Sequence, residues 1–157
     1  MSITLSNPAV VRDAFEKALA THSQERGHFF LARFLGFELT YSDESCTVVF
    51  AVREDLCNPR GLLHGGVVAT ALDVAMGHLT QHVAACGAAT AGLTVQYFRA
   101  VRTGTVRATA RIARKGSRLW FLEADLVGAD GERLASASST VALAQGDETT
   151  PSRTHSQ

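Results

Sequence analysis

The pattern of apolar and polar positions predicts a helical region at the start of the chain. Apolar residues recur at helical spacing over 10–19, directly after Asn7 and Pro8, a pair typical of a helix start. The polar stretch 21–27 indicates a break, and the apolar residues of 28–35 then indicate a second short helix or an irregular segment. The chain up to residue 35 is therefore expected to form an N-terminal helical segment.

Strand-like segments surround a second, much longer helical pattern. The apolar run from Gly65 to Ala84 predicts this long helix, and short segments rich in β-branched and aromatic residues lie on either side of it. Turn-like residues separate the later segments, and Asp130-Gly131 is the strongest hairpin signal among them. The expected strands lie at 37–41, 46–52, 89–99, 104–114, 118–128 and 132–143.

The short turns between these strands favour antiparallel pairing. Two strands, one long apolar helix and four more strands predict an α+β domain over residues 36–144, in which a six-stranded antiparallel sheet wraps around a central helix. Because only Thr70 and Asp73 are polar between Val67 and Gly77, this helix is expected to be buried nearly all round. The polar tail 145–157 is expected to be disordered.

The composition fits one globular domain and argues against two classes of partner. The 157 residues are 46% hydrophobic, but no apolar run reaches the roughly 18 residues that a membrane span needs. Fifteen basic and fifteen acidic residues give no overall field that would attract nucleic acid. The N-terminal residues lack the features of a secretory signal. We therefore expect a cytoplasmic protein that binds neither nucleic acid nor membranes.

Cysteine and histidine positions do not indicate a metal site. Cys46, Cys57 and Cys86 are odd in number and lack ligand spacing, so free thiols are expected. His78 and His82 have the i, i+4 spacing of a zinc pair, but no third ligand is evident and ordinary helix-end histidines are favoured. We expect neither a metal nor a separate cofactor.

Two glycines stand where the long helix is expected to begin. The first backbone N–H groups of a helix have no intrahelical acceptor and lie at the positive end of the helix dipole. Gly65 and Gly66 would let a ligand oxygen approach them closely, and stabilising a developing negative charge in this way is worth about 3–4 kcal/mol per donor. A tight turn that merely starts the helix is the alternative explanation for an isolated Gly-Gly pair.

Asp73 lies on the otherwise apolar part of the same helix. A carboxylate in such surroundings is costly unless it is paired or used. A structural aspartate, bonded to the backbone or to a neighbouring hydroxyl, remains the alternative. The glycine pair upstream makes a functional carboxylate the better explanation.

The segment Asn58-Pro-Arg-Gly-Leu-Leu-His64-Gly65-Gly66, with Asp73 eight residues after Gly65, resembles the hotdog-fold acyl-CoA thioesterases of the phenylacetate-degradation type. The resemblance covers about residues 30–144. It includes Phe34-Leu-Gly-Phe-Glu before the first strand and Val95-Gln-Tyr-Phe-Arg after the helix. Family members often carry a proline where this chain continues Ala100-Val101, and some have Glu instead of Asp at the acid position.

This resemblance implies hydrolysis of an acyl-CoA thioester to a free acid and coenzyme A, which is part of the substrate. The N–H of Gly65 would hold the carbonyl oxygen, and Asp73 would act either as nucleophile or as general base. Asn58 would orient the carbonyl group or the attacking water. His64 would bond the substrate or, by slight preference, brace the loop. Thr90 matches a Ser/Thr position near the scissile bond.

The resemblance also bears on coenzyme A binding and on assembly. A basic turn between two strands would lie beside the nucleotide, although a solvated hairpin end is the plainer explanation of such a cluster. The family further implies a homodimer or homotetramer whose sheets continue edge to edge, with sites between the subunits. The substrate-binding residues expected in addition to the catalytic ones are Gly66, Thr90, Arg114, Lys115, Gly116, Ser117 and Arg118.

Two other functions are open on sequence grounds. Hotdog domains also serve as non-catalytic acyl-CoA-binding modules, which would need no acid near the carbonyl, so Asp73 argues against that function. A hotdog dehydratase or hydratase would use an acid paired with a histidine, for which His64 and Asp73 are possible partners. The two glycines after His64 fit a thioesterase better.

Overall fold

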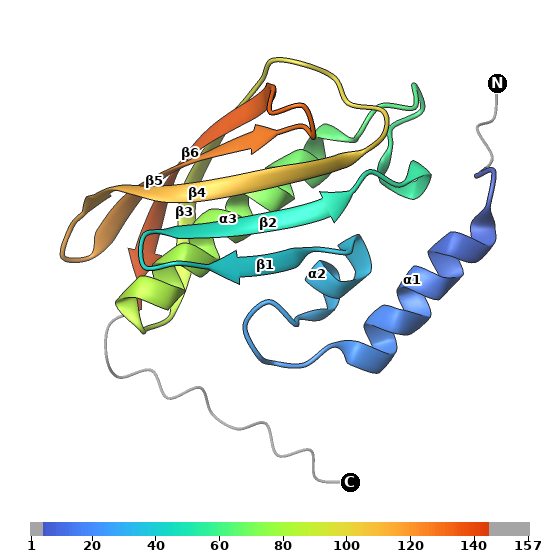
Figure 1. Cartoon of the computed structure of the whole chain (residues 1–157). Coiled ribbons are helices and arrows are strands. Elements are labelled where there is room, and N and C mark those ends of the chain that lie inside the picture. Colours follow the sequence, from blue (N-terminus) through green and yellow to red (C-terminus); the bar gives the residue numbers. More distant parts are fainter. Residues whose placement is uncertain (1–4, 145–157) are drawn as a thin grey trace, which may run out of the picture.

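The computed structural model describes residues 5–144, which form one curved sheet around a long helix (Figure 1). The six strands have the order β1-β2-β4-β5-β6-β3, and every neighbouring pair is antiparallel. The strands are β1 (Glu38–Tyr41), β2 (Ser45–Ala51), β3 (Ala88–Tyr97), β4 (Thr105–Lys115), β5 (Leu119–Val127) and β6 (Arg133–Leu143). The predicted strands are thus confirmed, with ends that differ by at most two residues.

The central helix α3 (Gly65–Ala84) packs its apolar side against the concave face of the sheet. Leu72, Met76 and Leu79 are fully buried there against strand residues such as Leu122 and Leu126. The opposite side of α3 is only partly covered, which corrects the expectation of burial all round. One sheet encloses a single helix on one side only, so a row of small and polar residues remains partly or fully exposed: Gly66, Thr70, Asp73, Gly77 and Gln81.

The N-terminal segment forms a pair of helices beside β1 (Figure 1). α1 (Pro8–Thr21) begins where the Asn7 side chain accepts a hydrogen bond from the N–H of Ala9, as its sequence predicts. α2 (Phe30–Leu35) lies against it and ends at a left-handed glycine. The edge-on contacts of Phe15 with Phe30 and Phe34 join the two helices.

Strand β3 is an edge strand and contains an irregularity. Its register with β6 shifts between Thr90 and Gly92, so Ala91 is an extra residue. Without this shift, Thr90 and Tyr97 would lie on opposite faces of the strand, because they are separated by an odd number of residues. With it, both face α3 and hydrogen-bond to that helix.

A short helix and the C-terminal tail remain. The single-turn helix η1 (Glu54–Leu56) was not predicted from the sequence, and its Glu54 carboxylate accepts from the backbone N–H of Ser6. The predicted disordered tail, 145–157, lies outside the described residues. Between residues 5 and 144, no helix has both the length and the apolar character needed to cross a bilayer.

Candidate active site

The loop before α3 is held by the side chain of Asn58. Its Oδ1 accepts hydrogen bonds from the backbone N–H groups of Arg60 and Leu62, at 2.9 and 3.2 Å. Because both partners are donors, the amide orientation is fixed, and the two Nδ2 hydrogens have no acceptor among the described residues. Asn58 therefore braces the loop through its oxygen and keeps a donor for a ligand.

The first turn of α3 is held from two sides. The Nδ1 atom of His64 accepts a hydrogen bond from the N–H of Gly66 at 2.9 Å, which caps the helix. The hydroxyl of Tyr97 donates to the carbonyl oxygen of Gly65, also at 2.9 Å. The N–H of Gly65 has no acceptor within residues 5–144. This arrangement favours the bracing role expected for His64 and leaves one helix-terminal donor for a substrate.

Gly65 does not have a positive φ, because the glycines with that conformation are at other positions of the described chain. Its lack of a side chain matters for space instead. A Cβ atom at Gly65 would lie 3.4 Å from the ring of Tyr97, and one at Gly66 would lie 3.0 Å from the Nδ1 atom of His64. The glycine pair thus allows these two side chains to approach the helix closely.

A cavity of about 260 Å³ opens beside this helix start. Asn58 and Gly65 lie at its wall, together with the half-exposed rings of Tyr97 and Phe98. The rest of the lining is apolar except for Arg99 and comes from both the loop and the sheet: Leu62, Leu63, Val68, Arg99, Ala100, Val101, Leu126, Leu134 and Ala135. Such a cavity suits an apolar group whose polar end meets the donors at the helix start.

Asp73 is not part of that cavity. It lies eight residues after Gly65 on the same helix, which corresponds to about 12 Å along the axis. Its carboxylate is partly exposed and accepts a hydrogen bond of 2.7 Å from the hydroxyl of Thr90 on β3. Thr90, expected near the scissile bond, thus lies beside the proposed acid and orients one of its oxygens.

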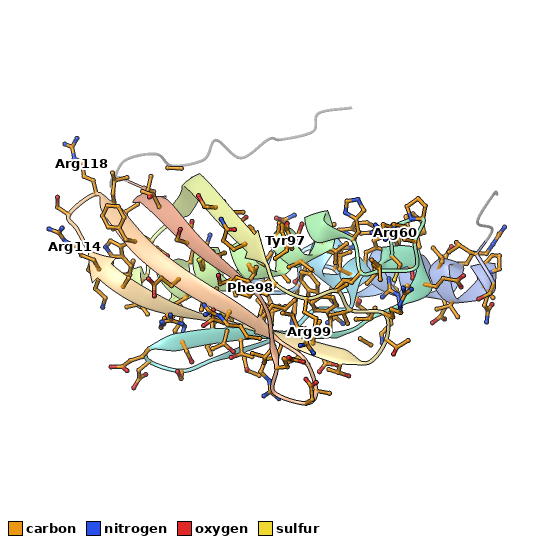
Figure 2. The ribbon with its side chains drawn as sticks, turned by 90° about the horizontal axis from the view of Figure 1, so that it is seen from above. Arg60, Tyr97, Phe98, Arg99, Arg114 and Arg118 are labelled. Carbon is orange, nitrogen blue, oxygen red and sulfur yellow. The ribbon has the colours of Figure 1, made fainter. Side chains whose placement is uncertain are left out.

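The basic turn joins β4 and β5 at the far end of the sheet. Figure 2 shows Arg114 and Arg118 there, away from Tyr97 and Arg60. A side-chain hydrogen bond stabilises the turn: the Trp120 indole N–H donates to the Gly116 carbonyl oxygen at 3.0 Å. The side chains of Arg114, Lys115, Ser117 and Arg118 are exposed. Within one chain, therefore, this turn does not come near the cavity beside Gly65.

The two helix histidines form a cluster with aromatic residues. The Tyr41 hydroxyl and Nδ1 of His78 are 3.0 Å apart, Phe29 stacks on His78, and the Tyr41 ring also contacts His82. Burial, and secondarily the positive charge of Arg26, lower the pKa of His78 below its ordinary value. The histidines thus serve packing between α3 and β1. No group of three potential metal ligands occurs in residues 5–144.

Tyr97 is a site residue that the sequence did not predict. Its position in a strand pattern indicated only a strand, because an aromatic residue in a strand is ordinary. The structure also bears on the dehydratase alternative, which needs a histidine paired with Asp73. The Nδ1 atom of His64 accepts a hydrogen bond from the N–H of Gly66, so this nitrogen is not available to pair with Asp73.

Solved structures of similar shape identify the architecture. A protein of Bacillus halodurans solved with CoA is 23% identical and has a TM-score of 0.80, covering 93% of this chain and 99% of that chain. The present chain has the hotdog fold. A thioesterase mutant of Pseudomonas aeruginosa is 22% identical with a TM-score of 0.68, covering 88% and 96%. A conserved protein of the same organism is 25% identical with a TM-score of 0.71, covering 78% and 99%.

Sequence comparison supports this assignment of the hotdog fold. The model of the thioesterase superfamily matches residues 60–135, which include the glycine pair, Asp73 and Thr90. No curated protein matches this chain.

Proposed function

We propose that this hotdog protein is an acyl-CoA thioesterase of the phenylacetate-degradation type. The proposal is carried by the N–H of Gly65, which has no acceptor among residues 5–144 and lies beside a mostly apolar cavity, in a segment that matches the thioesterase superfamily. The cavity suits the acyl group, and the N–H suits the thioester carbonyl oxygen. The Nδ2 group of Asn58 supplies a second donor at the same wall.

The reaction requires an oxygen nucleophile at the carbonyl carbon. Either the Asp73 carboxylate attacks directly and water hydrolyses the resulting anhydride, or Asp73 removes a proton from the attacking water. In both routes a C–O bond forms, the C–S bond breaks, and the coenzyme A thiolate leaves and takes up a proton. Negative charge develops on the carbonyl oxygen, where the Gly65 N–H would stabilise it.

A single chain does not satisfy this chemistry. The attacking atom must lie about 3–3.5 Å from the carbonyl carbon, with the oxyanion donor about 3 Å from the carbonyl oxygen. The attacking atom and the oxyanion donor can therefore be no more than about 8 Å apart. The backbone positions of Gly65 and Asp73, however, are separated by about 12 Å along the axis of one helix. We propose that a second copy of the chain supplies the missing partner, so that each site combines Gly65 of one subunit with Asp73 of the other.

Two features support such a homodimer. Strand β3 is an edge strand whose ten residues include no charged side chain and no proline, so nothing blocks pairing with another strand. The open side of α3 carries small residues, and a Cβ atom at Gly77 would meet nothing within 4 Å. Pairing of β3 with its copy would cover both surfaces and continue the sheet edge to edge.

Antiparallel pairing also gives the basic turn a role. It places the C-terminal half of one α3 beside the N-terminal half of the other. The 114–118 turn lies near the C-terminal end of α3, because the Arg118 carbonyl oxygen accepts from the N–H of Leu143, and Leu143 pairs with Ala88 shortly after the helix. The turn of one subunit would thus approach the glycine end of its partner. This arrangement supports the proposal that Arg114, Lys115 and Arg118 bind the phosphates of coenzyme A.

The proposal is tested first with Asp73→Asn. This change keeps the size of the side chain but removes its charge, so hydrolysis should fall by at least about a hundredfold with the melting temperature retained. Thiol release from a panel of acyl-CoA esters is the measurement, and it also reports the acyl preference. Asp13→Asn on the exposed part of α1 is the matched control. Unchanged turnover in Asp73→Asn would refute the role of the carboxylate.

The shared site is tested by mixing two inactive variants. Gly65→Val fills the space at the helix start, and Asp73→Asn removes the acid, so each homodimer should be inactive. If they are unfolded together and refolded, half of the dimers are mixed, and each mixed dimer has one site with both native groups. About one quarter of the wild-type activity should return. No recovery, with mixed dimers present, would place both groups in one chain.

A further inference from the structure

Tyr97 makes two contacts with the helix start from a distant part of the chain. It ends β3, 32 residues after Gly65, and its hydroxyl donates to the Gly65 carbonyl oxygen at 2.9 Å. A Cβ atom at Gly65 would lie 3.4 Å from its ring, so the ring packs directly against this glycine. Gly65 and Tyr97 both line the 260 Å³ cavity.

The peptide unit between the two glycines is therefore held at both of its polar ends. Its carbonyl group, from Gly65, accepts from Tyr97, and its N–H, from Gly66, donates to His64. Two adjacent glycines give the backbone more freedom than any other pair of residues, and the first turn of a helix has few hydrogen bonds of its own. His64 and Tyr97 therefore add restraint to this peptide beyond the backbone hydrogen bonds of the helix.

From these contacts we infer that Tyr97 is a positioning residue for the thioester reaction. It fixes the Gly65–Gly66 peptide and so the orientation of the neighbouring N–H of Gly65, which would meet the developing negative charge. This inference rests on the proposed thioesterase function. A preorganised donor stabilises the transition state because its orientation does not have to be restored during the reaction.

A purely structural role for the hydroxyl does not match its surroundings. Within a single chain Tyr97 is 54% exposed, although the proposed dimer would cover part of β3. One hydrogen bond contributes little net free energy of unfolding, because the unfolded chain exchanges it for hydrogen bonds to water. Removing the hydroxyl should therefore affect the reaction more than the stability of the fold.

Tyr97→Phe tests this inference, since it removes the hydroxyl and keeps the ring against Gly65 and the cavity. We expect kcat to fall about fivefold to tenfold, KM to stay within about twofold, and the melting temperature to change little. Tyr41→Phe is the matched control, because Tyr41 is the other tyrosine of the chain and its hydroxyl bonds to His78 outside the cavity. That variant should leave kcat and KM unchanged.

Amide hydrogen exchange provides a readout that needs no turnover. In Tyr97→Phe, exchange of the Gly66 amide, which donates to His64, should become faster when followed by NMR on the whole protein, and in Tyr41→Phe it should not. Equal kcat in wild type and Tyr97→Phe, or unchanged exchange of the Gly66 amide, would overturn the positioning role alone. If the wild-type protein hydrolyses no acyl-CoA, the proposed function fails and the catalytic role of Tyr97 fails with it.

Discussion

At the scale of single residues, the hydrogen bond between Thr90 and Asp73 joins the proposed acid to the sheet. The hydroxyl donates to one carboxylate oxygen, which leaves the other oxygen to act on substrate or water. Thr90 is exposed, so this contact holds the side chain of Asp73 more than it holds the fold. A structural aspartate would make the same hydrogen bond. The effect on turnover of removing this bond therefore distinguishes a functional Asp73 from a structural one.

Thr90→Val removes the hydroxyl at nearly constant shape and should lower kcat about threefold to tenfold, because the carboxylate loses its fixed orientation. Valine also suits a strand, so the melting temperature should stay close to that of wild type. Thr90→Ser retains a donor and should keep most of the activity. Steady-state kinetics of the three proteins give the comparison. Equal turnover in Thr90→Val and wild type would show that the acid needs no such partner.

At the scale of elements, we expect the contact between α3 and β1 to depend on pH. His78 lies between the Phe29 ring and the Tyr41 hydroxyl, with Arg26 as the nearby charge that opposes its protonation. Its pKa is lowered in the folded state, so below about pH 6.5 the unfolded chain takes up a proton that the folded chain does not. The contribution of His78 to the free energy of unfolding therefore decreases as pH falls below 6.5. It levels off at pH values below the pKa of His78 in the folded state.

We expect the melting temperature to drop between pH 7.5 and pH 5.5, and to drop less in His78→Gln, which cannot be protonated. Thermal unfolding of both proteins at the two pH values is the measurement. His82→Gln, on the exposed part of the same helix end, is the control and should follow the wild type. Identical pH dependence in wild type and His78→Gln would mean that other groups account for the acid sensitivity.

Local patterns were enough to predict most of these elements, because apolar spacing and turn residues act within a few positions. The long helix was predicted with its observed bounds, 65–84, and all six strands were found. Contacts between distant residues were not predictable in this way. The approach of Tyr97 to Gly65 depends on where β3 ends, and that of Thr90 to Asp73 depends on a one-residue shift in the same strand. Period-two alternation alone would place Thr90 and Tyr97 on opposite faces.

At the scale of the whole molecule, the proposed dimer would bring the 114–118 turn of one subunit close to the glycine end of α3 in the other. The chain has equal numbers of acidic and basic residues, so its attraction for an anionic ligand has to be local. The exposed cations of the 114–118 turn form no ion pair with a carboxylate in residues 5–144. In the proposed dimer these cations can therefore bind the phosphates of a coenzyme A that lies at the glycine end of the second subunit.

Replacing Arg114 and Lys115 together by Ala should raise KM for acyl-CoA substrates several-fold with little change in kcat, because phosphate contacts bind substrate and transition state equally. A thioester of N-acetylcysteamine, which lacks the nucleotide, should be affected much less. The matched control, Arg12→Ala with Lys17→Ala on α1, removes the same charge from another surface. A similar loss with both substrates would mean that the turn does not contact the nucleotide.

The extra residue in β3 has a consequence for how this protein can vary. The strand contacts the helix at two places, through Thr90 near one end and Tyr97 at the other, and Ala91 makes both fall on the same face. Substitutions between Thr90 and Tyr97 leave the number of residues between them unchanged. A deletion or insertion within 92–96 would instead turn one of the two side chains outward. Among homologues that keep both contacts, the length of this segment should thus be held more strictly than its composition.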